Sequence, residues 1–201
     1  REITPETDVV FFESVSNPTL EVIDIAAVAK LAHAQNAKVV IDNVFASPVY
    51  SRAFEQGADV VIYSATKHID GQGRAMGGVI LGSEEYIRKT VEPFLKHTGP
   101  ALSPFSAWIM LKGLETIDLR VRAQTATAEA LAEALVGHPK LARAVYPGHP
   151  SHAQHDLCIR QMGKGGTLLA LDLAGGKEAA FRFLEDPADL IADVLQALDQ
   201  A

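Results

Sequence analysis

Three short apolar runs constrain the fold of this chain more than any other feature. They are residues 8–12 (DVVFF), 38–41 (KVVI) and 59–62 (DVVI), rich in β-branched and aromatic side chains. Continuous runs of this length are typical of strands buried on both faces of a parallel sheet. Between the first two, residues 21–35 repeat apolar side chains at helical spacing. The order strand, helix, strand predicts an open α/β sheet with right-handed crossovers.

The later sequence predicts a second, smaller unit. Helical or strand-like spacing of apolar residues marks further elements along the chain. The predicted helices are 48–56, 83–96 (capped by Ser83), 104–136, 152–162 and 187–200, and the predicted strands are 78–81, 141–146 and 166–173. We therefore expect residues 1–118 to be part of a large sheet domain and residues 119–201 to form a C-terminal α/β domain.

Composition excludes several classes of protein. Of the 201 residues 48% are hydrophobic, which suffices for a packed core, and the net charge of −7 offers no attraction for nucleic acid or anionic membranes. No apolar run approaches the roughly 20 residues of a membrane span. The single cysteine, Cys158, excludes an internal disulfide framework and fits a reducing compartment. We expect a cytoplasmic protein without nucleic-acid or membrane partners.

Polar residues follow the predicted strands at the positions where ligands bind in open parallel sheets. Asn17 follows the first strand, Asp42 ends the second, and Ser64, Thr66 and Lys67 follow the third. A lysine there can form a Schiff base, a carboxylate can pair with a protonated pyridine nitrogen, and hydroxyls can donate to a phosphate. Each residue alone also has an ordinary structural explanation: a surface lysine, a turn aspartate, a capping serine. Their convergence favours a cofactor site.

The segments that carry these residues resemble a known family. VVFFESVSNP, VVIDNVFASP and VVIYSATKHIDGQGRAMGG, then HTGPALSPFSAWIMLKGLET and YPGHPSHAQHDL, resemble the cystathionine γ-synthase group of Cys/Met-metabolism enzymes dependent on pyridoxal 5′-phosphate (PLP). The resemblance runs from about residue 8 to residue 184. It implies the fold type I, aspartate-aminotransferase-like α/β architecture.

The resemblance also implies roles for the five residues and no metal. Lys67 would hold PLP as a Schiff base, and Asp42 would bind the pyridine nitrogen. Ser64 and Thr66 would hold the phosphate. Asn17 would contact the phenolic side of the cofactor and the substrate carboxylate.

Within the group, DNVFASP and GQGRAMGG are most similar to O-succinylhomoserine sulfhydrylases. Val44 stands where many relatives carry threonine, so a hydroxyl contact is lost there. The implied reaction of methionine biosynthesis joins O-succinylhomoserine (or O-acetylhomoserine) and sulfide to give homocysteine, in a homotetramer. Cystathionine γ-synthase, cystathionine γ-lyase and methionine γ-lyase remain alternatives within the group. A non-catalytic truncated homologue is the alternative outside the enzymes.

Members of the group are much longer than this chain, so we expect a fragment. The phosphate-binding loop, the stacking tyrosine and a Tyr/Arg pair would precede residue 1. The arginine that binds the substrate carboxylate would lie between AFRFL and EDP, which are contiguous here. We therefore expect an internal gap near residues 184–185.

Three other motifs give rival hypotheses. Residues 64–67 match S-x-x-K of serine-nucleophile enzymes, but S-D-N and K-T-G are absent from the sequence. The glycines of GQGRAMG depart from the dinucleotide-binding spacing and do not occupy the first strand-to-helix turn. His149, His152 and His155 suggest a metal, but no acidic or cysteine cluster completes such a site.

Overall fold

The computed structural model describes residues 2–185. The chain divides into two compact units, and we describe each by itself. The first comprises Arg1–Val15 and Ile23–Val121, and the second comprises Ser16–Val22 and Arg122–Ala201. The sequence reasoning placed one boundary near residue 118 and did not foresee that Ser16–Val22 groups with the later part of the chain. The predicted helix 187–200 lies outside the described residues.

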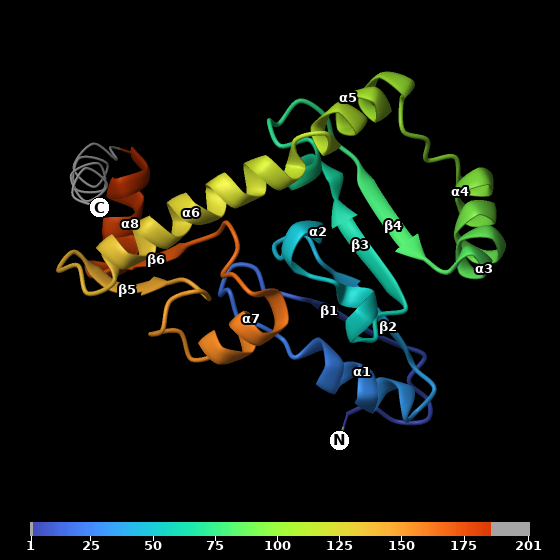
Figure 1. The fold of residues 1–201 in the computed structure, drawn as a ribbon, viewed down its shortest axis with the longest axis horizontal. Coiled ribbons are helices and arrows are strands. Elements are labelled where there is room, and N and C mark those ends of the chain that lie inside the picture. Colours follow the sequence, from blue (N-terminus) through green and yellow to red (C-terminus); the bar gives the residue numbers. More distant parts are fainter. Residues whose placement is uncertain (1, 186–201) are drawn as a thin grey trace. The chain divides into compact units, whose positions relative to one another are not determined.

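A four-stranded sheet organises the first unit (Figure 1). Its strands are β1 (Val9–Glu13), β2 (Lys38–Asp42), β3 (Val60–Ser64) and β4 (Gly78–Gly82), in that spatial order. The first three are parallel, and β4 is antiparallel to β3. The three apolar runs are therefore confirmed as neighbouring parallel strands. Their carboxyl ends lie at one edge of the sheet.

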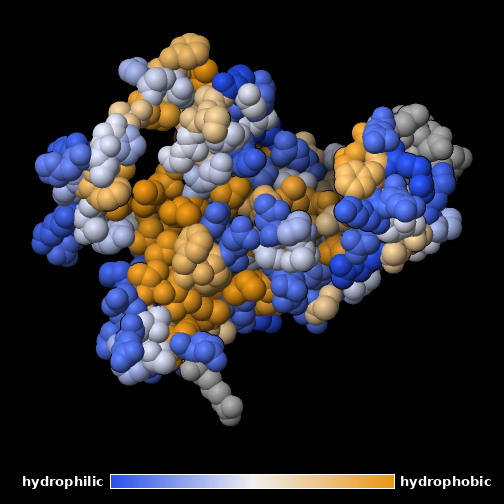
Figure 2. Space-filling model, turned by 180° about the vertical axis from the view of Figure 1, so that it is seen from behind, coloured by the Kyte–Doolittle hydropathy of each residue, from blue (hydrophilic) through white to orange (hydrophobic). Residues whose placement is uncertain are grey.

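The two faces of this sheet are covered unequally. One face carries Val39 and Ile41, which are fully buried and share a core with Ile25 of helix α1 (Ile25–His33). On the other face, Val9 is 51% exposed and Phe11 is 59% exposed. Figure 2 shows apolar side chains gathered at the surface of the molecule. The prediction that the strands are buried on both faces is thus wrong for the outer strand within the part of the chain that the structure describes.

Several predicted helices are interrupted. In place of one helix at 48–56, α2 (Ser47–Tyr50) and a 3₁₀ turn (Ala53–Gln56) follow each other, and a π-helical turn (Ile87–Val91) separates α3 (Glu84–Tyr86) from α4 (Glu92–Thr98). The Ser83 hydroxyl accepts a hydrogen bond from the Tyr86 N–H (3.2 Å), so the predicted cap is confirmed. The remaining helix between 104 and 136 is divided at Glu115 and Thr116. The two resulting helices are α5 (Pro104–Leu114) and α6 (Ile117–Leu135).

Helix α5 presents a large apolar surface. Phe105 is 68% exposed, Trp108 55% and Leu111 61%, whereas Met110 is buried in the core of the first unit. Within the described residues, core burial therefore explains Met110. It does not explain the three exposed side chains, Phe105, Trp108 and Leu111.

The second unit contains a small antiparallel sheet, β5 (Leu141–Val145) and β6 (Ala170–Leu173), with α7 (His155–Met162) and α8 (Gly176–Glu185). Tyr146 packs with two alanines of α6, and its hydroxyl donates to the Gly166 carbonyl (2.9 Å). Helix α8 continues through Leu184 to Glu185, the last described residue, and the internal gap near that point stays a prediction. Within residues 2–185, no helix is both long and apolar enough to span a membrane.

Candidate cofactor site

A single π-helical turn, Ala65–Ile69, follows β3 and carries Lys67; we call it the Lys67 turn. At Lys67 the backbone leaves the helical conformation (φ −87°, ψ −114°), and the side chain is exposed. Within the part of the chain that the structure describes, the Lys67 side chain is open to solvent. The amine is thus free to reach a ligand at this edge of the sheet.

Asp42 is the last residue of β2 and is partly buried. It lies beside Glu13 of β1 and Ile62 of β3 in the strand register. Burial raises the pKa of the Asp42 carboxyl and the nearby charge of Glu13 raises it further, while a hydrogen bond from the Val44 N–H to Oδ1 (3.1 Å) opposes both. A cationic group beside Asp42 would offset these unfavourable effects on the carboxylate.

Ser64 and Thr66 place two hydroxyls beside Asp42 and Lys67. Ser64 lies two residues beyond Ile62, the partner of Asp42, so Asp42 and Ser64 share one face of the sheet. The Ser64 side chain makes no capping hydrogen bond to the Lys67 turn. The Thr66 hydroxyl accepts from the Gly77 N–H (3.1 Å) and lies 3.5 Å from the Gly77 carbonyl. Both hydroxyls suit an anionic group at this edge.

Asn17 belongs to the second unit, in the segment Ser16–Val22. Its side chain is exposed, and its peptide bond to Pro18 is cis. The structure therefore brings together four of the five predicted residues, those of the first unit. The contact of Asn17 with a cofactor stays a prediction.

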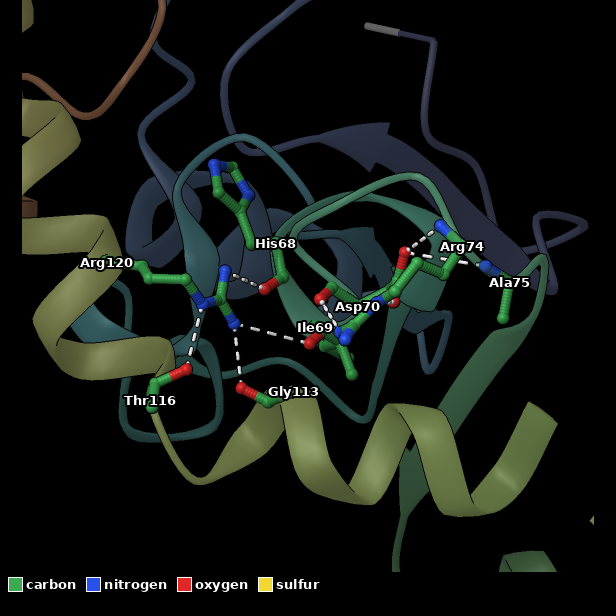
Figure 3. A network of polar contacts seen from close by, with 8 residues as sticks. All are labelled: His68, Ile69, Asp70, Arg74, Ala75, Gly113, Thr116 and Arg120. Carbon is green, nitrogen blue, oxygen red and sulfur yellow. Dashed lines mark hydrogen bonds and ion pairs between the residues drawn. The ribbon is translucent and has the colours of Figure 1, made fainter. Parts of the chain in front are cut away.

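The sequence did not predict the part played by an arginine beside the Lys67 turn and a histidine within it (Figure 3). Arg120, from α6, directs its guanidinium at backbone carbonyls of this turn. The His68 ring nitrogen Nδ1 lies 3.1 Å from the Val44 carbonyl. Burial lowers the pKa of His68 and the Arg120 charge lowers it further, although the Val44 carbonyl opposes them. No sequence signal joins Arg120 to residues some fifty positions earlier, since the pairing arises from tertiary contact.

A buried carboxylate, Asp70, was also missed. It accepts hydrogen bonds from the Arg74 backbone N–H (2.6 Å) and from Arg74 Nε (3.0 Å), and it is fully buried. Burial alone raises the pKa of Asp70, but the hydrogen bonds from Arg74 and Ala75 and the Arg74 charge outweigh it, and the net pKa is lowered. Arg74 lies in the loop after the Lys67 turn, where the spacing rules for helical pairs do not apply, so the local sequence did not mark this pair.

The metal hypothesis finds no support in the second unit. His149 Nδ1 lies 2.7 Å from the Ser151 hydroxyl, and His152 Nδ1 accepts from the Gln154 N–H (3.1 Å). Over residues 2–185, no three or more His, Cys, Asp or Glu side chains gather in a way that could hold a metal ion. Cys158 is buried, and burial raises the pKa of its thiol to about 11.

Comparison with known proteins identifies close relatives. The chain is 52% identical over 189 residues to an O-succinylhomoserine sulfhydrylase of Mycobacterium tuberculosis, covering 92% of this chain and 47% of the relative. It is 50% identical over 181 residues to the O-succinylhomoserine sulfhydrylase of Pseudomonas aeruginosa, covering 90% and 45%. An L-methionine γ-lyase of Pseudomonas putida is 39% identical over 183 residues, covering 90% and 46%.

A solved structure of metB from Corynebacterium glutamicum has the same fold. It superimposes with a TM-score of 0.87 at 35% sequence identity, covering 90% of this chain and 47% of that one. The chain spans about half the length of the curated relatives it matches. The sequence profile of Cys/Met metabolism PLP-dependent enzymes matches residues 1–192. These matches, together with the fold type I α/β architecture of the chain, establish that it belongs to the Cys/Met metabolism PLP-dependent enzyme family.

Proposed function

We propose that this chain is part of a sulfhydrylase that converts O-succinylhomoserine, or O-acetylhomoserine, and sulfide to homocysteine. The observation that carries the proposal is the difference in sequence identity between two kinds of relative. Two O-succinylhomoserine sulfhydrylases are 52% and 50% identical to the chain, whereas an L-methionine γ-lyase is 39% identical. All three comparisons cover similar parts of the chain, so the difference is not due to length.

The residues at the edge of the sheet fit PLP. Asp42, whose pKa burial raises, suits a protonated pyridine nitrogen, because that cation would stabilise the carboxylate. Ser64 lies on the same face, and its hydroxyl does not cap the Lys67 turn, so it suits the phosphate together with Thr66. Lys67 is exposed beside them and would carry the cofactor covalently. When bound, PLP supplies an electron sink for charge that develops at the substrate's α carbon.

The chemistry required of this chain is then proton transfer and orientation. Lys67 Nζ would take the proton from the α carbon of the substrate and return protons at later steps, which its exposed side chain permits. Asp42 would stay ionised and keep its partner nitrogen protonated. The role expected of Asn17 is contact with the phenolic side of the cofactor and with the substrate carboxylate.

We also propose a cytoplasmic homotetramer for the complete protein. The exposed Phe105, Trp108 and Leu111 of α5 support burial of this helix in an assembly. Light scattering of the purified protein would measure the number of subunits. A monomer at micromolar concentration would contradict this part of the proposal.

Product assays test the activity. The complete protein is incubated with O-succinylhomoserine, O-acetylhomoserine or cystathionine, with and without sulfide, and homocysteine is measured. We expect sulfide to raise homocysteine output from an acylhomoserine. If it does not, the sulfhydrylase assignment fails, and turnover with cystathionine or with cysteine as nucleophile would identify the related activity instead.

Borohydride trapping tests the anchor. Reduction makes the bond between cofactor and lysine permanent, and peptide mapping should then place a pyridoxyl group on Lys67. Lys67→Ala should lose the adduct. Lys89→Ala, which removes an exposed lysine paired with Glu85 on the surface, should keep it. Absence of an adduct from the PLP-treated protein would favour the non-catalytic homologue.

A further inference from the structure

We propose that Arg120 is a positioning residue for Lys67, fixing the backbone from which the lysine side chain extends. The inference rests on the proposed role of Lys67. Arg120 belongs to a different element, α6, and lies 53 positions after Lys67 in the chain. Arg120 touches neither cofactor nor substrate in this proposal and acts only through the Lys67 turn.

The guanidinium of Arg120 binds two segments at once (Figure 3). Nη1 donates to the carbonyl of His68 (2.9 Å), the residue directly after Lys67, and Nη2 lies 3.4 Å from the Ile69 carbonyl. Nη2 also donates to the Gly113 carbonyl (2.7 Å), and Nε donates to the Thr116 hydroxyl (3.1 Å). A planar group with several fixed donors is required to reach these acceptors together, and a lysine ammonium does not provide that geometry.

The Lys67 turn depends on such an outside donor. It is a single turn, closed by hydrogen bonds from the Asp70 N–H to the Ala65 carbonyl (2.8 Å) and from the Gly71 N–H to the Lys67 carbonyl (2.7 Å). Because no further turn follows, the next carbonyls lack the helical donors that they would meet in a longer helix. Arg120 supplies those donors. Its removal would take away the hydrogen bonds that the His68 and Ile69 carbonyls accept from α6.

The backbone is shaped to admit this guanidinium. Gly71 has φ +75°, and a Cβ at this position would overlap the Nη1 and Cζ atoms of Arg120. Asp70, between the turn and Gly71, is held independently by Arg74. The segment after Lys67 is therefore fixed from two sides by two arginines that have different acceptors. A fixed backbone limits the positions that Lys67 Nζ can reach, which is the property that proton transfer requires.

The test compares Arg120→Met and Arg120→Lys in the complete protein. Arg120→Met removes every N–H donor of the side chain. Arg120→Lys keeps the positive charge but loses the planar arrangement of several donors that the guanidinium provides. Arg52→Met is the matched control, because the Arg52 side chain is 77% exposed and forms a surface ion pair with Glu55. Thermal unfolding of each variant establishes that the proteins are folded before the comparison.

Hydrogen exchange in the cofactor-free protein gives the first readout. We expect the amide hydrogens of Asp70 and Gly71 to exchange at least about tenfold faster in Arg120→Met. The reason is that the segment loses the local stability that one to two hydrogen bonds contribute. Arg120→Lys should fall between Arg120→Met and the unaltered protein, and Arg52→Met should match the unaltered protein. Unchanged exchange at these two amides in Arg120→Met would overturn the inference.

Cofactor trapping gives the second readout. With PLP at a limiting concentration, borohydride should trap about tenfold less adduct on Lys67 in Arg120→Met than in the unaltered protein. Equal trapping in a folded Arg120→Met would refute the positioning role while leaving the proposed function intact. An absence of adduct in the unaltered protein would refute the proposed function instead, and the exchange measurement would still decide whether Arg120 fixes the turn.

Discussion

Gly113→Ala has two opposed effects on the free energy of unfolding: a gain in helix propensity and a steric clash with the Lys67 turn. The structure indicates which of the two is larger. Gly113 lies inside α5, where replacing glycine by alanine normally stabilises a helix by about 0.5–1 kcal/mol. Here an added Cβ would overlap the backbone carbonyl oxygen of Ile69 and lie 3.0 Å from that of Asp70. Backbone atoms do not move aside as a flexible side chain does, and inserting a methyl group into a packed interior costs about 1–3 kcal/mol. We expect a net loss of about 1–2 kcal/mol, and displacement of α5 from the Lys67 turn.

Urea unfolding followed by circular dichroism measures this free energy, with thermal melting as a second measurement. Lys112→Ala, at the neighbouring exposed position, is the control for helix propensity and should change stability by no more than about 0.5 kcal/mol. Because the Gly113 carbonyl also accepts from Arg120, Gly113→Ala should weaken PLP retention as well as stability. If Gly113→Ala instead made the protein more stable, by the amount expected from helix propensity alone, α5 would not be packed tightly against the Lys67 turn.

Three further predictions follow from burial and charge. Ile41→Ala, at a fully buried position, should lower the free energy of unfolding by about 2–5 kcal/mol, whereas Leu31→Ala, at a 61% exposed position, should change it by less than about 0.5 kcal/mol; denaturant titration measures both. Glu13→Gln removes a negative charge that raises the pKa of Asp42, so the acid limb of the pH profile of kcat/KM should move to lower pH; a shift to higher pH, or none, would contradict the assignment of that limb to Asp42. Cys158, with a thiol pKa of about 11, should resist alkylation by iodoacetamide at pH 8 in the folded protein and react after unfolding, as peptide mapping can show.

The strands of the sheet were largely predictable from the sequence, but the interruptions of the helices were less so. Continuous β-branched runs predicted β1, β2 and β3 to within two residues at each end, since such runs have few alternatives in a short strand. The break at Glu115 and Thr116 carries no local signal as strong as a proline, whereas Pro93, in the first turn of α4, was a usable signal for the break between α3 and α4. Uneven burial of the sheet was also missed. A continuous apolar strand looks the same in sequence whether one face or both are covered by this chain.

The residues of the candidate site were predictable from the sequence, but the contacts that hold them in place were not. Asp42, Ser64, Thr66 and Lys67 follow strands that local sequence identifies, and parallel strands bring their carboxyl ends to one edge. The exposure of Lys67 was not predictable, because burial depends on elements that fold over the loop. The grouping of Asn17 with the second unit likewise depends on packing between distant segments.

By itself, the sequence determined the parallel strands, the residue types at the strand ends and the family, because these depend on local pattern and on the spacing of motifs. Only the tertiary structure decided what holds those residues in place. The contact of Arg120 with the carbonyls of His68 and Ile69 joins segments more than fifty residues apart. Backbone carbonyls are chemically identical along the chain. Which of them meets an arginine is therefore set by how α6 packs against the Lys67 turn, and no local pattern of side chains records it.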